Sequence, residues 1–445
     1  MFELIAAWLL ATKSESPAVL RSTNLSAWTA QISVPTLLEP QNRPDEDALS
    51  DLQTYLGQLS YFGWDTEGQG IWLQSGQTVL AQHQGKVPLP AASLTKIATT
   101  LVALTTWGSD HQFVTTISAT GTIENGVLQG DLIVQGGGNP LFVWEEAIAL
   151  ANQLQAIGLT RVTGRVIITG PFSMNYEPEA MVAGRLLQTA FDAALWTQEV
   201  EQQYALMPPD TPRPTLAIEG AVTAMGEAQT ASLRPRPLAR HYSLSLGQLL
   251  KLMNLYSNNF MADLLADSLG GGAAISREGA ALTGVPQREI QLVNGSGLGL
   301  ENRLSARAAA AMLKAIQARL APDGLGVSDV FPVAGRDSGT LRGRRIPEGT
   351  PVKTGTLATV SALAGGLSTR DRDVVWFAII NQGSNLVELR AQQDYFLEDL
   401  TQRWEMSGPS GPDPENSGPE NLSPETEIIF GDPARIEPAA APLSF

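Results

Sequence analysis

Hydrophobic residues recur with helical spacing in four long segments of the chain, and shorter alternating runs lie between them. Apolar positions that repeat at i, i+3 and i+4 predict amphipathic helices, and a glycine just past such a pattern indicates where the helix ends. The first predicted helix begins at Ser93. The others cover 143–157, 245–269 and 305–320, with helix stops at Gly158 and at Gly270 to Gly272.

The alternating runs predict strands. Residues 70–84 alternate around Ser75 and Gly76, which is typical of a hairpin. Short β runs follow from about Thr115, and residues 350–383 alternate as two strands around a turn at 368–372. This mixture predicts an α/β protein in which sheets and helices pack together.

A chain of 445 residues is too long for one ordinary core, so we expect more than one domain. The change to short strands and the turn-rich stretch near Pro237 mark boundaries. The predicted parts are a leader and connector (1–46), a first domain part (47–114), an inserted, mostly β domain (115–237), a second domain part (238–404) and a disordered, acidic Pro/Ser/Gly-rich tail (405–445).

Composition excludes several classes of function. The formal net charge is -16, whereas binding a phosphate backbone requires clusters of Lys and Arg, so we expect no nucleic-acid partner. The chain has no cysteine, which excludes disulfides and thiolate chemistry, and its three histidines stand apart from one another. We therefore expect no metal and no cofactor.

The apolar run from Leu4 to Ala11 is too short to span a bilayer, so we expect no integral membrane span. It has the length of the apolar part of a signal peptide, although Glu3 stands where a positive charge is usual. The segment therefore favours a periplasmic or exported protein.

The helix that begins at Ser93 carries one lysine, Lys96, among small and apolar residues. An unpaired ammonium group is costly to bury, so this lysine needs a partner or a chemical task. Three residues of helix place it within reach of the serine, and burial lowers a lysine pKa toward that of a useful base. Ser93 is therefore a candidate nucleophile and Lys96 its candidate base.

Two more motifs follow along the chain. Ser257, Asn258 and Asn259 form one, and the run Lys353-Thr354-Gly355-Thr356 forms the other on a predicted strand. Ser-x-x-Lys, Ser-Asp-Asn and Lys-Thr-Gly in this order are typical of penicillin-binding proteins and class A β-lactamases, and here Asn258 takes the middle position of the second motif.

Chemistry suggests a role for each candidate. We expect Ser257 to relay a proton to the leaving amine and Asn259 to orient Lys96 and bind the substrate amide. Lys353 presents a positive charge to a substrate carboxylate. Thr354 and Thr356 offer hydroxyl groups beside it, Gly355 lets the substrate backbone approach, and the backbone N–H groups of Ser93 and Thr356 would form an oxyanion hole.

The motifs and several longer stretches resemble the penicillin-binding protein 4 type of D-alanyl-D-alanine carboxypeptidase/endopeptidase, the low-molecular-mass class C penicillin-binding proteins. The similar stretches are "GVLQGDLIVQGGGNP", "VNGSGLGLENRLS" and "FPVAGRDSGTLRGR", and the resemblance runs from about Leu52 to Leu400. Asn139 and Asn294 stand where the family usually has Asp.

The resemblance implies a transpeptidase/β-lactamase-like antiparallel sheet flanked by helices, with a mostly β domain inserted between the first two motifs. It also implies a serine D-alanyl-D-alanine carboxypeptidase/endopeptidase that acts on peptidoglycan stem peptides through an acyl-enzyme and that binds β-lactams.

Two alternatives remain open. A serine β-lactamase has the same fold, and Tyr256-Ser257-Asn258 also fits the Tyr-x-Asn motif of class C β-lactamases. A class A enzyme would need a deacylating Glu-x-x-x-Asn element, from which Glu289 and Asn294 depart by one position. The second alternative is a catalytically silent protein that binds cell-wall peptides. The long insertion favours the carboxypeptidase.

Overall fold

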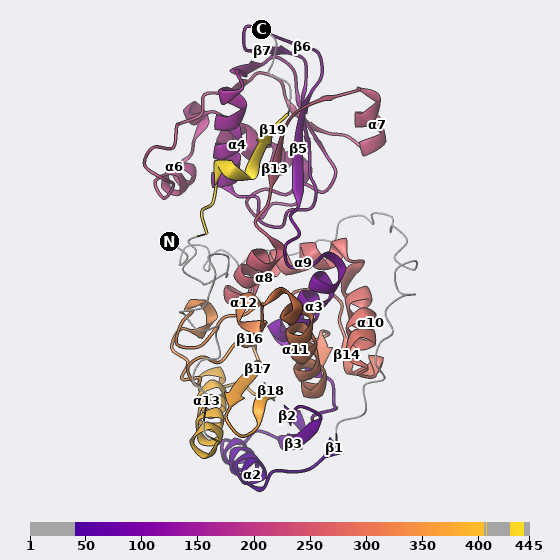
Figure 1. The fold of residues 1–445 in the computed structure, drawn as a ribbon, viewed down its shortest axis with the longest axis vertical. Helices are drawn as coiled ribbons and strands as arrows, with labels where there is room; N and C mark the ends of the chain where they lie inside the picture. The colour runs from indigo at the N-terminus through magenta and orange to yellow at the C-terminus, as the bar shows by residue number, and fades with distance from the viewer. Residues whose placement is uncertain (1–40, 405, 407–427, 440–445) are drawn as a thin grey trace. The chain divides into compact units, whose positions relative to one another are not determined.

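The computed structural model describes residues 41–404, 406 and 428–439. They divide into two compact units (Figure 1). The first unit takes its described residues from 1–109 and 246–422, and the second from 110–245 and 423–445. The segment at Leu4 to Ala11, on which the export prediction depends, lies outside the described residues.

The first unit contains a sheet whose six described strands have the order β1-β3-β2-β18-β17-β16. All neighbours are antiparallel except β1 and β3. The strands are β1 (Gln41–Asn42), β2 (Gln69–Ser75), β3 (Thr78–His83), β16 (Val352–Leu357), β17 (Val360–Thr369) and β18 (Asp373–Gln382). The predicted hairpin at Ser75 and Gly76 is present as β2 and β3. The segment predicted as two strands forms three, because the chain also turns at 358–359.

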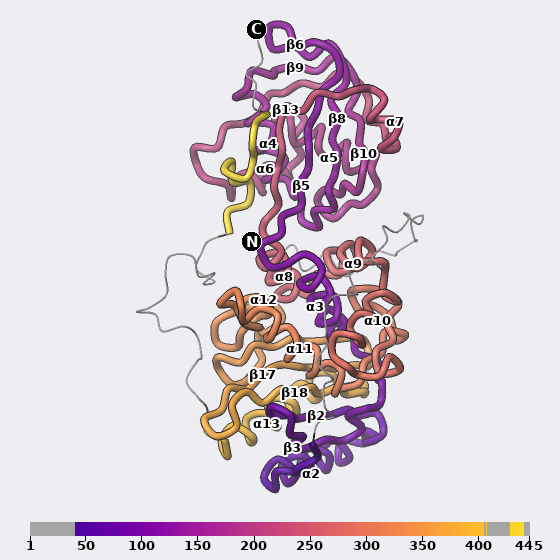
Figure 2. The backbone as a smooth tube through the Cα atoms, turned by 45° about the vertical axis from the view of Figure 1, so that its right-hand side comes forward, coloured from indigo at the N-terminus to yellow at the C-terminus, as the bar shows by residue number. Residues whose placement is uncertain are grey.

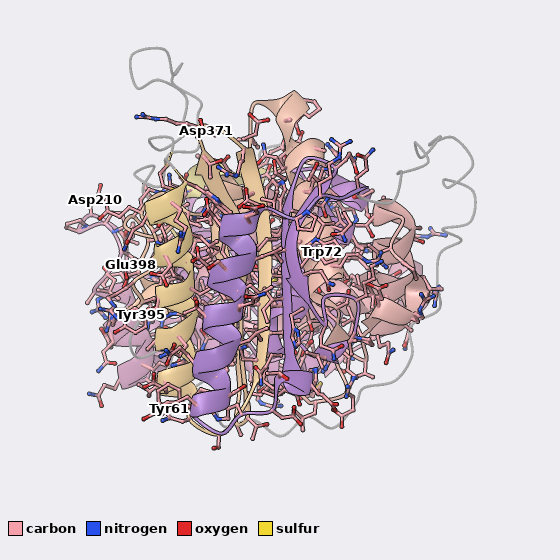
Figure 3. All side chains as sticks on the ribbon, turned by 90° about the horizontal axis from the view of Figure 1, so that it is seen from below. Tyr61, Trp72, Asp210, Asp371, Tyr395 and Glu398 are labelled. Carbon is pink, nitrogen blue, oxygen red and sulfur yellow. The ribbon has the colours of Figure 1, made fainter. Side chains whose placement is uncertain are left out.

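Helices flank both faces of this sheet, which confirms the predicted fold class. Helices α2 (Glu46–Tyr61) and α13 (Leu386–Arg403) lie side by side on one face (Figure 3). Helix α11 (Ala306–Leu320) packs against β2, β17 and β18 on the other face. The core below α2 and α13 is buried and apolar, with Trp404, Phe377 and Leu59 among its largest side chains.

Further helices of the first unit include those that hold Ser93, Lys96 and Asn259. They are η3 (Ala92–Leu94), α3 (Thr95–Trp107), α8 (Leu246–Leu255), α9 (Asn259–Ser268), α10 (Gly271–Thr283) and α12 (Val327–Val330), and a small sheet is formed by β4 (Leu89–Pro90), β14 (Ile290–Gln291) and β15 (Arg303–Leu304). The long helix predicted over 245–269 is broken at 256–258 into α8 and α9. The break is where Ser257 lies.

In the second unit, six described strands form one sheet in the order β12-β10-β8-β5-β13-β19, and four form another in the order β11-β9-β7-β6. Strands β5, β8 and β10 of the larger sheet run side by side (Figure 2). The strands are β5 (Val114–Ala119), β6 (Thr122–Glu124), β7 (Val127–Gln129), β8 (Leu132–Gln135), β9 (Arg161–Val162), β10 (Val166–Thr169), β11 (Ala217–Ile218), β12 (Val222–Ala224), β13 (Arg236–Tyr242) and β19 (Ile436–Pro438). The helices are α4 (Trp144–Ala156), α5 (Ala180–Phe191), α6 (Gln198–Tyr204) and α7 (Glu227–Ser232). The unit therefore has more helix than the mostly β domain that the sequence predicts.

Two predicted boundaries are wrong. Residues 428–439 are not part of a disordered tail, because β19 pairs with β13, Ile436 is buried and Arg435 forms an ion pair with the buried Glu146. At the other end, residues 41–46 are not only a connector. Strand β1 pairs with β3, and the Asp45 side chain accepts a hydrogen bond from the Ala48 N–H at the start of α2.

The described helices include no stretch with the length and hydropathy that a membrane crossing requires.

Candidate active site

Ser93 lies in the 3-10 turn that leads into α3, and the backbone around it is tightly constrained. Ala92 has φ of 48°, in the left-handed region that alanine rarely adopts. Gly297 packs directly against the backbone of the same residue. A Cβ at this glycine would therefore overlap the Ala92 carbonyl oxygen. Such local strain persists only where the surrounding structure holds it, which is common at functional sites.

Lys96 is completely buried on the first turn of α3 and makes three hydrogen bonds. Its Nζ donates to Ser93 Oγ at 3.0 Å, to Asn259 Oδ1 at 2.8 Å and to the Ser296 carbonyl at 2.8 Å. Burial lowers the pKa of Lys96 to about 7, and the charge of Asp263 opposes this shift. A lysine with this pKa is partly neutral near pH 7, so it can accept a proton from Ser93.

The motif at 257–259 forms the junction between α8 and α9. Asn258 is the N-cap of α9, and its side chain accepts a hydrogen bond from the Met261 N–H at 3.0 Å. Asn259 is the first residue of the helix and directs its side-chain oxygen to Lys96. Ser257 has φ of 53° and accepts a hydrogen bond from Lys353 Nζ at 3.1 Å. The middle residue of the motif is therefore a helix cap.

Lys353 is also completely buried, on β16, and donates to Ser257 Oγ and to the Thr354 carbonyl. Burial and the nearby charge of Lys96 both lower the pKa of Lys353 well below its usual range. Neither of these two acceptors is an anion, so a carboxylate that bound here would favour the charged form of this lysine.

The packing of β16 requires a glycine at position 355, apart from any role of Gly355 in substrate binding. A Cβ at this position would lie 2.9 Å from the Ala91 carbonyl oxygen and 3.2 Å from the Ala92 Cβ. Strand β16 can therefore approach the segment that carries Ser93 only because residue 355 has no side chain.

Sequence analysis missed a carboxylate and a loop that hold Lys96 in place. Asp263 Oδ1 accepts hydrogen bonds from the Gly295 N–H at 3.0 Å and the Ser296 N–H at 2.8 Å. These bonds fix the loop whose Ser296 carbonyl accepts from Lys96. Asp263 is four residues after Asn259 on α9, and that spacing was the available signal.

Another missed residue is Arg390, on α13. Its Nη2 donates to Thr356 Oγ1 at 2.8 Å, so it reaches the strand of the Lys-Thr-Gly motif from a helix that the sequence did not connect with the site. Thr356 is exposed and Thr354 is buried. Alternate residues of a strand lie on the same face, so these two threonines share one face of β16.

All eight predicted site residues lie in the first unit. The structure brings Ser93, Lys96 and Asn259 into one hydrogen-bonded group, and Ser257 with Lys353 into another. Thr354, Gly355 and Thr356 continue along β16. Within the described residues, no group of three His, Asp or Glu side chains is arranged to hold a metal ion.

The sheet, its flanking helices and the serine-lysine pair at the head of a buried helix define the class of penicillin-binding proteins and serine β-lactamases. The model of the D-Ala-D-Ala carboxypeptidase 3 (S13) family matches residues 66–179 and 215–402. The chain therefore belongs to this family of serine D-Ala-D-Ala carboxypeptidases, which confirms the predicted resemblance and enzyme class.

Two relatives match most of the chain. The carboxypeptidase DacB of Mycolicibacterium smegmatis is 27% identical over 348 residues, which are 68% of this chain and 74% of the relative. A carboxypeptidase of Mycobacterium tuberculosis is 28% identical over 393 residues, covering 74% of this chain and 78% of the relative.

Solved structures share the fold. A predatory endopeptidase of Bdellovibrio bacteriovorus, in complex with an immunity protein, superposes with a TM-score of 0.67 at 19% identity, over 83% of this chain and 99% of its own. Penicillin-binding protein 4 of Haemophilus influenzae gives a TM-score of 0.58 at 20% identity, over 80% of this chain and 98% of its own.

Proposed function

We propose that Ser93 is the nucleophile of this carboxypeptidase and that neutral Lys96 is its general base. The observation that carries the proposal is the position of Lys96 Nζ, 3.0 Å from Ser93 Oγ and 2.8 Å from Asn259 Oδ1, on a buried lysine whose pKa is about 7. The Asn259 oxygen and the Ser296 carbonyl accept hydrogen bonds from Nζ, and they account for both N–H groups of a neutral amine. The lone pair of that amine is then directed at the serine hydroxyl.

The reaction proceeds through an ester on Ser93. Oγ attacks the carbonyl carbon of the penultimate D-Ala while Lys96 takes the hydroxyl proton, and the backbone N–H groups of Ser93 and Thr356 receive the negative oxygen. The carbon–nitrogen bond then breaks, and the proton that Lys96 took passes by way of Ser257, which is hydrogen-bonded to Lys353, to the departing amine. In the second half-reaction water attacks the ester while Lys96 takes one of its protons. The bond between the acyl carbon and Ser93 Oγ then breaks, Lys96 returns the proton to Oγ, and the shortened peptide leaves with a new carboxyl group.

The substrates that fit this site are peptidoglycan stem peptides that end in a D-alanine carboxylate. Lys353 and the hydroxyl groups of Thr354 and Thr356 would hold that carboxylate. A β-lactam presents the same carboxylate beside a reactive amide, so it would acylate the same serine. Because peptidoglycan lies outside the cytoplasmic membrane, the enzyme would act after export.

Mass spectrometry after incubation with benzylpenicillin tests the proposal. We expect one long-lived penicilloyl group on Ser93, because the chain offers Lys96 and Ser257 for both half-reactions, and the opened ring fragment stays beside the ester where water would enter. Rapid turnover of penicillin without an accumulated adduct would indicate the β-lactamase alternative. No adduct and no release of D-alanine would indicate a silent binding protein.

Replacing Lys353 by alanine should weaken recognition of the terminal carboxylate. Loss of one partner of a buried charge-assisted contact costs about 2–4 kcal/mol, so kcat/KM for a D-Ala-D-Ala peptide should fall roughly 30- to 1,000-fold. The measurement is steady-state release of D-alanine. The control is the same peptide with its C-terminus amidated, for which the variant and the original protein should differ much less. An unchanged kcat/KM for the free carboxylate would contradict the assignment.

A further inference from the structure

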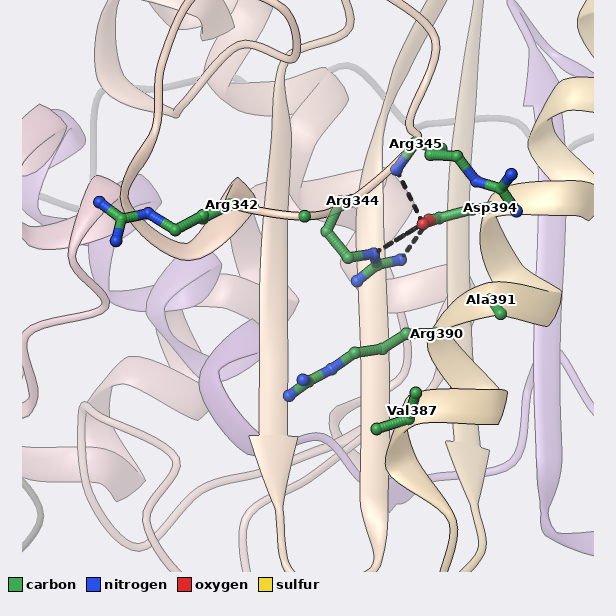
Figure 4. Close-up of a pocket in the computed structure, with 8 residues that line it drawn as sticks. Arg342, Arg344, Arg345, Val387, Arg390, Ala391 and Asp394 are labelled. Carbon is green, nitrogen blue, oxygen red and sulfur yellow. Dashed lines mark hydrogen bonds and ion pairs between the residues drawn. The ribbon is translucent and has the colours of Figure 1, made fainter.

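The side chain of Arg390 extends away from α13 and over the neighbouring strands of the catalytic sheet (Figure 4). Its Nη2 donates a hydrogen bond at 2.8 Å to Oγ1 of Thr356 on β16. Arg390 is half-buried, whereas Thr356 is exposed. The contact therefore joins a guanidinium group, which is always charged, to a hydroxyl group that the proposed function assigns to the substrate carboxylate.

The carboxylate nearest to Arg390 along its own helix is engaged elsewhere. Asp394 is four residues after Arg390, the usual spacing for an ion pair on a helix. However, Asp394 Oδ1 accepts from Arg344 Nη2 at 2.7 Å, and Asp394 Oδ2 accepts from the Arg345 backbone N–H at 2.9 Å, as the dashed lines in Figure 4 show. Arg344 and Asp394 are both almost completely buried. The loop before β16 thus binds this carboxylate, and Arg390 directs its guanidinium group to Thr356.

The hydrogen bond from Arg390 determines which way the Thr356 hydroxyl group can point. Arginine has only donors, so Thr356 Oγ1 must be the acceptor in this pair. The hydrogen of the hydroxyl group then has to point away from Arg390, where it can be donated to a substrate. Hydrogen bonds that follow one another in a chain polarise each other, so accepting from a cation makes this hydroxyl group a stronger donor.

Arg390 also contributes a positive charge that does not depend on the state of the two site lysines. Burial lowers the pKa of Lys96 to about 7, and burial together with the charge of Lys96 lowers the pKa of Lys353 well below its usual range. The charge of each lysine therefore varies with pH and with what is bound. Burial and then the charge of Arg344 lower the pKa of Arg390 as well, but an arginine begins high enough to stay protonated.

This inference rests on the proposed function, which places the terminal carboxylate of the substrate at Thr354 and Thr356. We propose that Arg390 is a positioning residue for that carboxylate and that it acts through the hydroxyl group of Thr356. It turns this hydroxyl group toward the substrate and gives the site a permanent positive charge. Arg390 therefore determines how strongly the enzyme prefers peptides that end in a free carboxylate over peptides that end in an amide.

Steady-state kinetics with a D-Ala-D-Ala peptide and its C-terminal amide test the inference. Arg390→Gln should raise KM for the free carboxylate about tenfold, the value of one hydrogen bond to a charged group, and should leave kcat nearly unchanged. The reason is that the carboxylate is bound before and during the reaction alike. For the amide, this variant and the original protein should differ little.

Two further variants serve as controls for the charge. Arg390→Lys should keep most of the preference for the free carboxylate, because a lysine retains the charge and can donate one hydrogen bond to Thr356. Arg277→Gln, which removes an exposed arginine of α10, should leave the kinetics of both peptides unchanged. A fall in kcat for both peptides with Arg390→Gln would mean that Arg390 only supports the packing of β16, and it would overturn the inference.

A double-mutant cycle tests whether Arg390 acts through Thr356. Thr356→Val removes the hydroxyl group and keeps the shape of the side chain. In this background Arg390→Gln should have little further effect on KM, because residues that act through one contact are not additive. An undiminished effect of Arg390→Gln in the valine variant would contradict the positioning role.

A binding measurement separates this inference from the proposed function. Calorimetry on the Ser93→Ala variant should detect tighter binding of the free carboxylate than of the amide, and adding Arg390→Gln should reduce this difference about tenfold. A preference that survives Arg390→Gln would overturn the inference and leave the proposed function standing. Equal binding of both peptides while Arg390 is present would instead overturn the carboxylate site of the proposed function, and the inference with it.

Discussion

Replacing Ser93 by alanine is expected to abolish both acylation by benzylpenicillin and release of D-alanine. The substitution removes the atom that forms the ester, and a general base without its nucleophile contributes little, so kcat should fall on the order of 10⁴-fold or more. Lys96 would lose one of its three hydrogen bonds but keep those to Asn259 and Ser296, so the buried site should remain assembled.

The measurement is intact-protein mass spectrometry with peptide mapping, together with steady-state peptidase activity. Ser268→Ala is the matched control, because this serine lies on α9 and only donates a hydrogen bond to the Leu264 carbonyl. Thermal unfolding should show that both variants are folded. A penicilloyl group mapped to Ser257, or an active Ser93→Ala variant, would contradict the assignment of the nucleophile.

Replacing Lys96 by methionine should reduce acylation about 10²- to 10⁴-fold, the range that general-base catalysis contributes. Methionine keeps most of the side-chain volume in a site that is completely buried, so the loss would report the missing base. Stopped-flow acylation by a chromogenic β-lactam measures the effect. Lys314→Met, on α11, is the control for the same change elsewhere, and an equal loss in both variants would contradict the role.

The dependence of the acylation rate on pH distinguishes a catalytic base at Lys96 from a residue that only fills space. The pKa of Lys96 is about 7 and the neutral form is the active one, so acylation should rise with pH through about 7 and level off above it. Below this pKa the lysine is protonated and cannot take the serine proton. In the Lys96→Met variant the residual acylation rate should no longer increase with pH in this range. A profile in the original protein that is flat from about pH 5 to about pH 9 would contradict the mechanism.

The local parts of the site could be predicted from the sequence. Ser93 and Lys96 are three residues apart where the 3-10 turn of Ser93 leads into α3, and residues at this spacing on a helix are neighbours on one face. A lysine among apolar residues already indicated a buried partner or a task. Order and spacing were also enough for the motifs at 257–259 and 353–356, because each occupies a single turn or strand.

The contacts of the residues that support the site could not be predicted in this way, although the spacing of Asn259 and Asp263 places both on one face of a helix. Asp263 acts on Lys96 through the loop at 295–296, and Arg390 reaches Thr356 from a helix that follows two further strands. These contacts join segments that only the folded chain brings together. Nothing in the local pattern around Arg390 distinguishes it from a solvated arginine on the surface of a helix.

The prediction for the C-terminal part was wrong for a related reason. Residues from Ser407 onward are rich in Pro, Ser, Gly and Glu, and such a composition cannot bury much apolar surface by itself. Strand β19 is only three residues long, and it is ordered because an existing sheet edge on β13 pairs with it. Arg435 adds an ion pair with the buried Glu146, whose other carboxylate oxygen is hydrogen-bonded to His241 Nε2.

The pairing of β2 with β18 has a consequence for biogenesis. Ile71 lies opposite Ile379 in this ladder, so the central strands of the catalytic sheet come from the two ends of the unit, and residues 110–245 of the second unit are synthesised between them. Contacts of such sequence separation form slowly, because a long loop must close before they contribute. A nascent chain cannot complete this sheet until strand β18 has been synthesised. Until then the turn that carries Ser93 lacks its strand partner β16, so the newly synthesised chain would remain inactive until the sheet is complete.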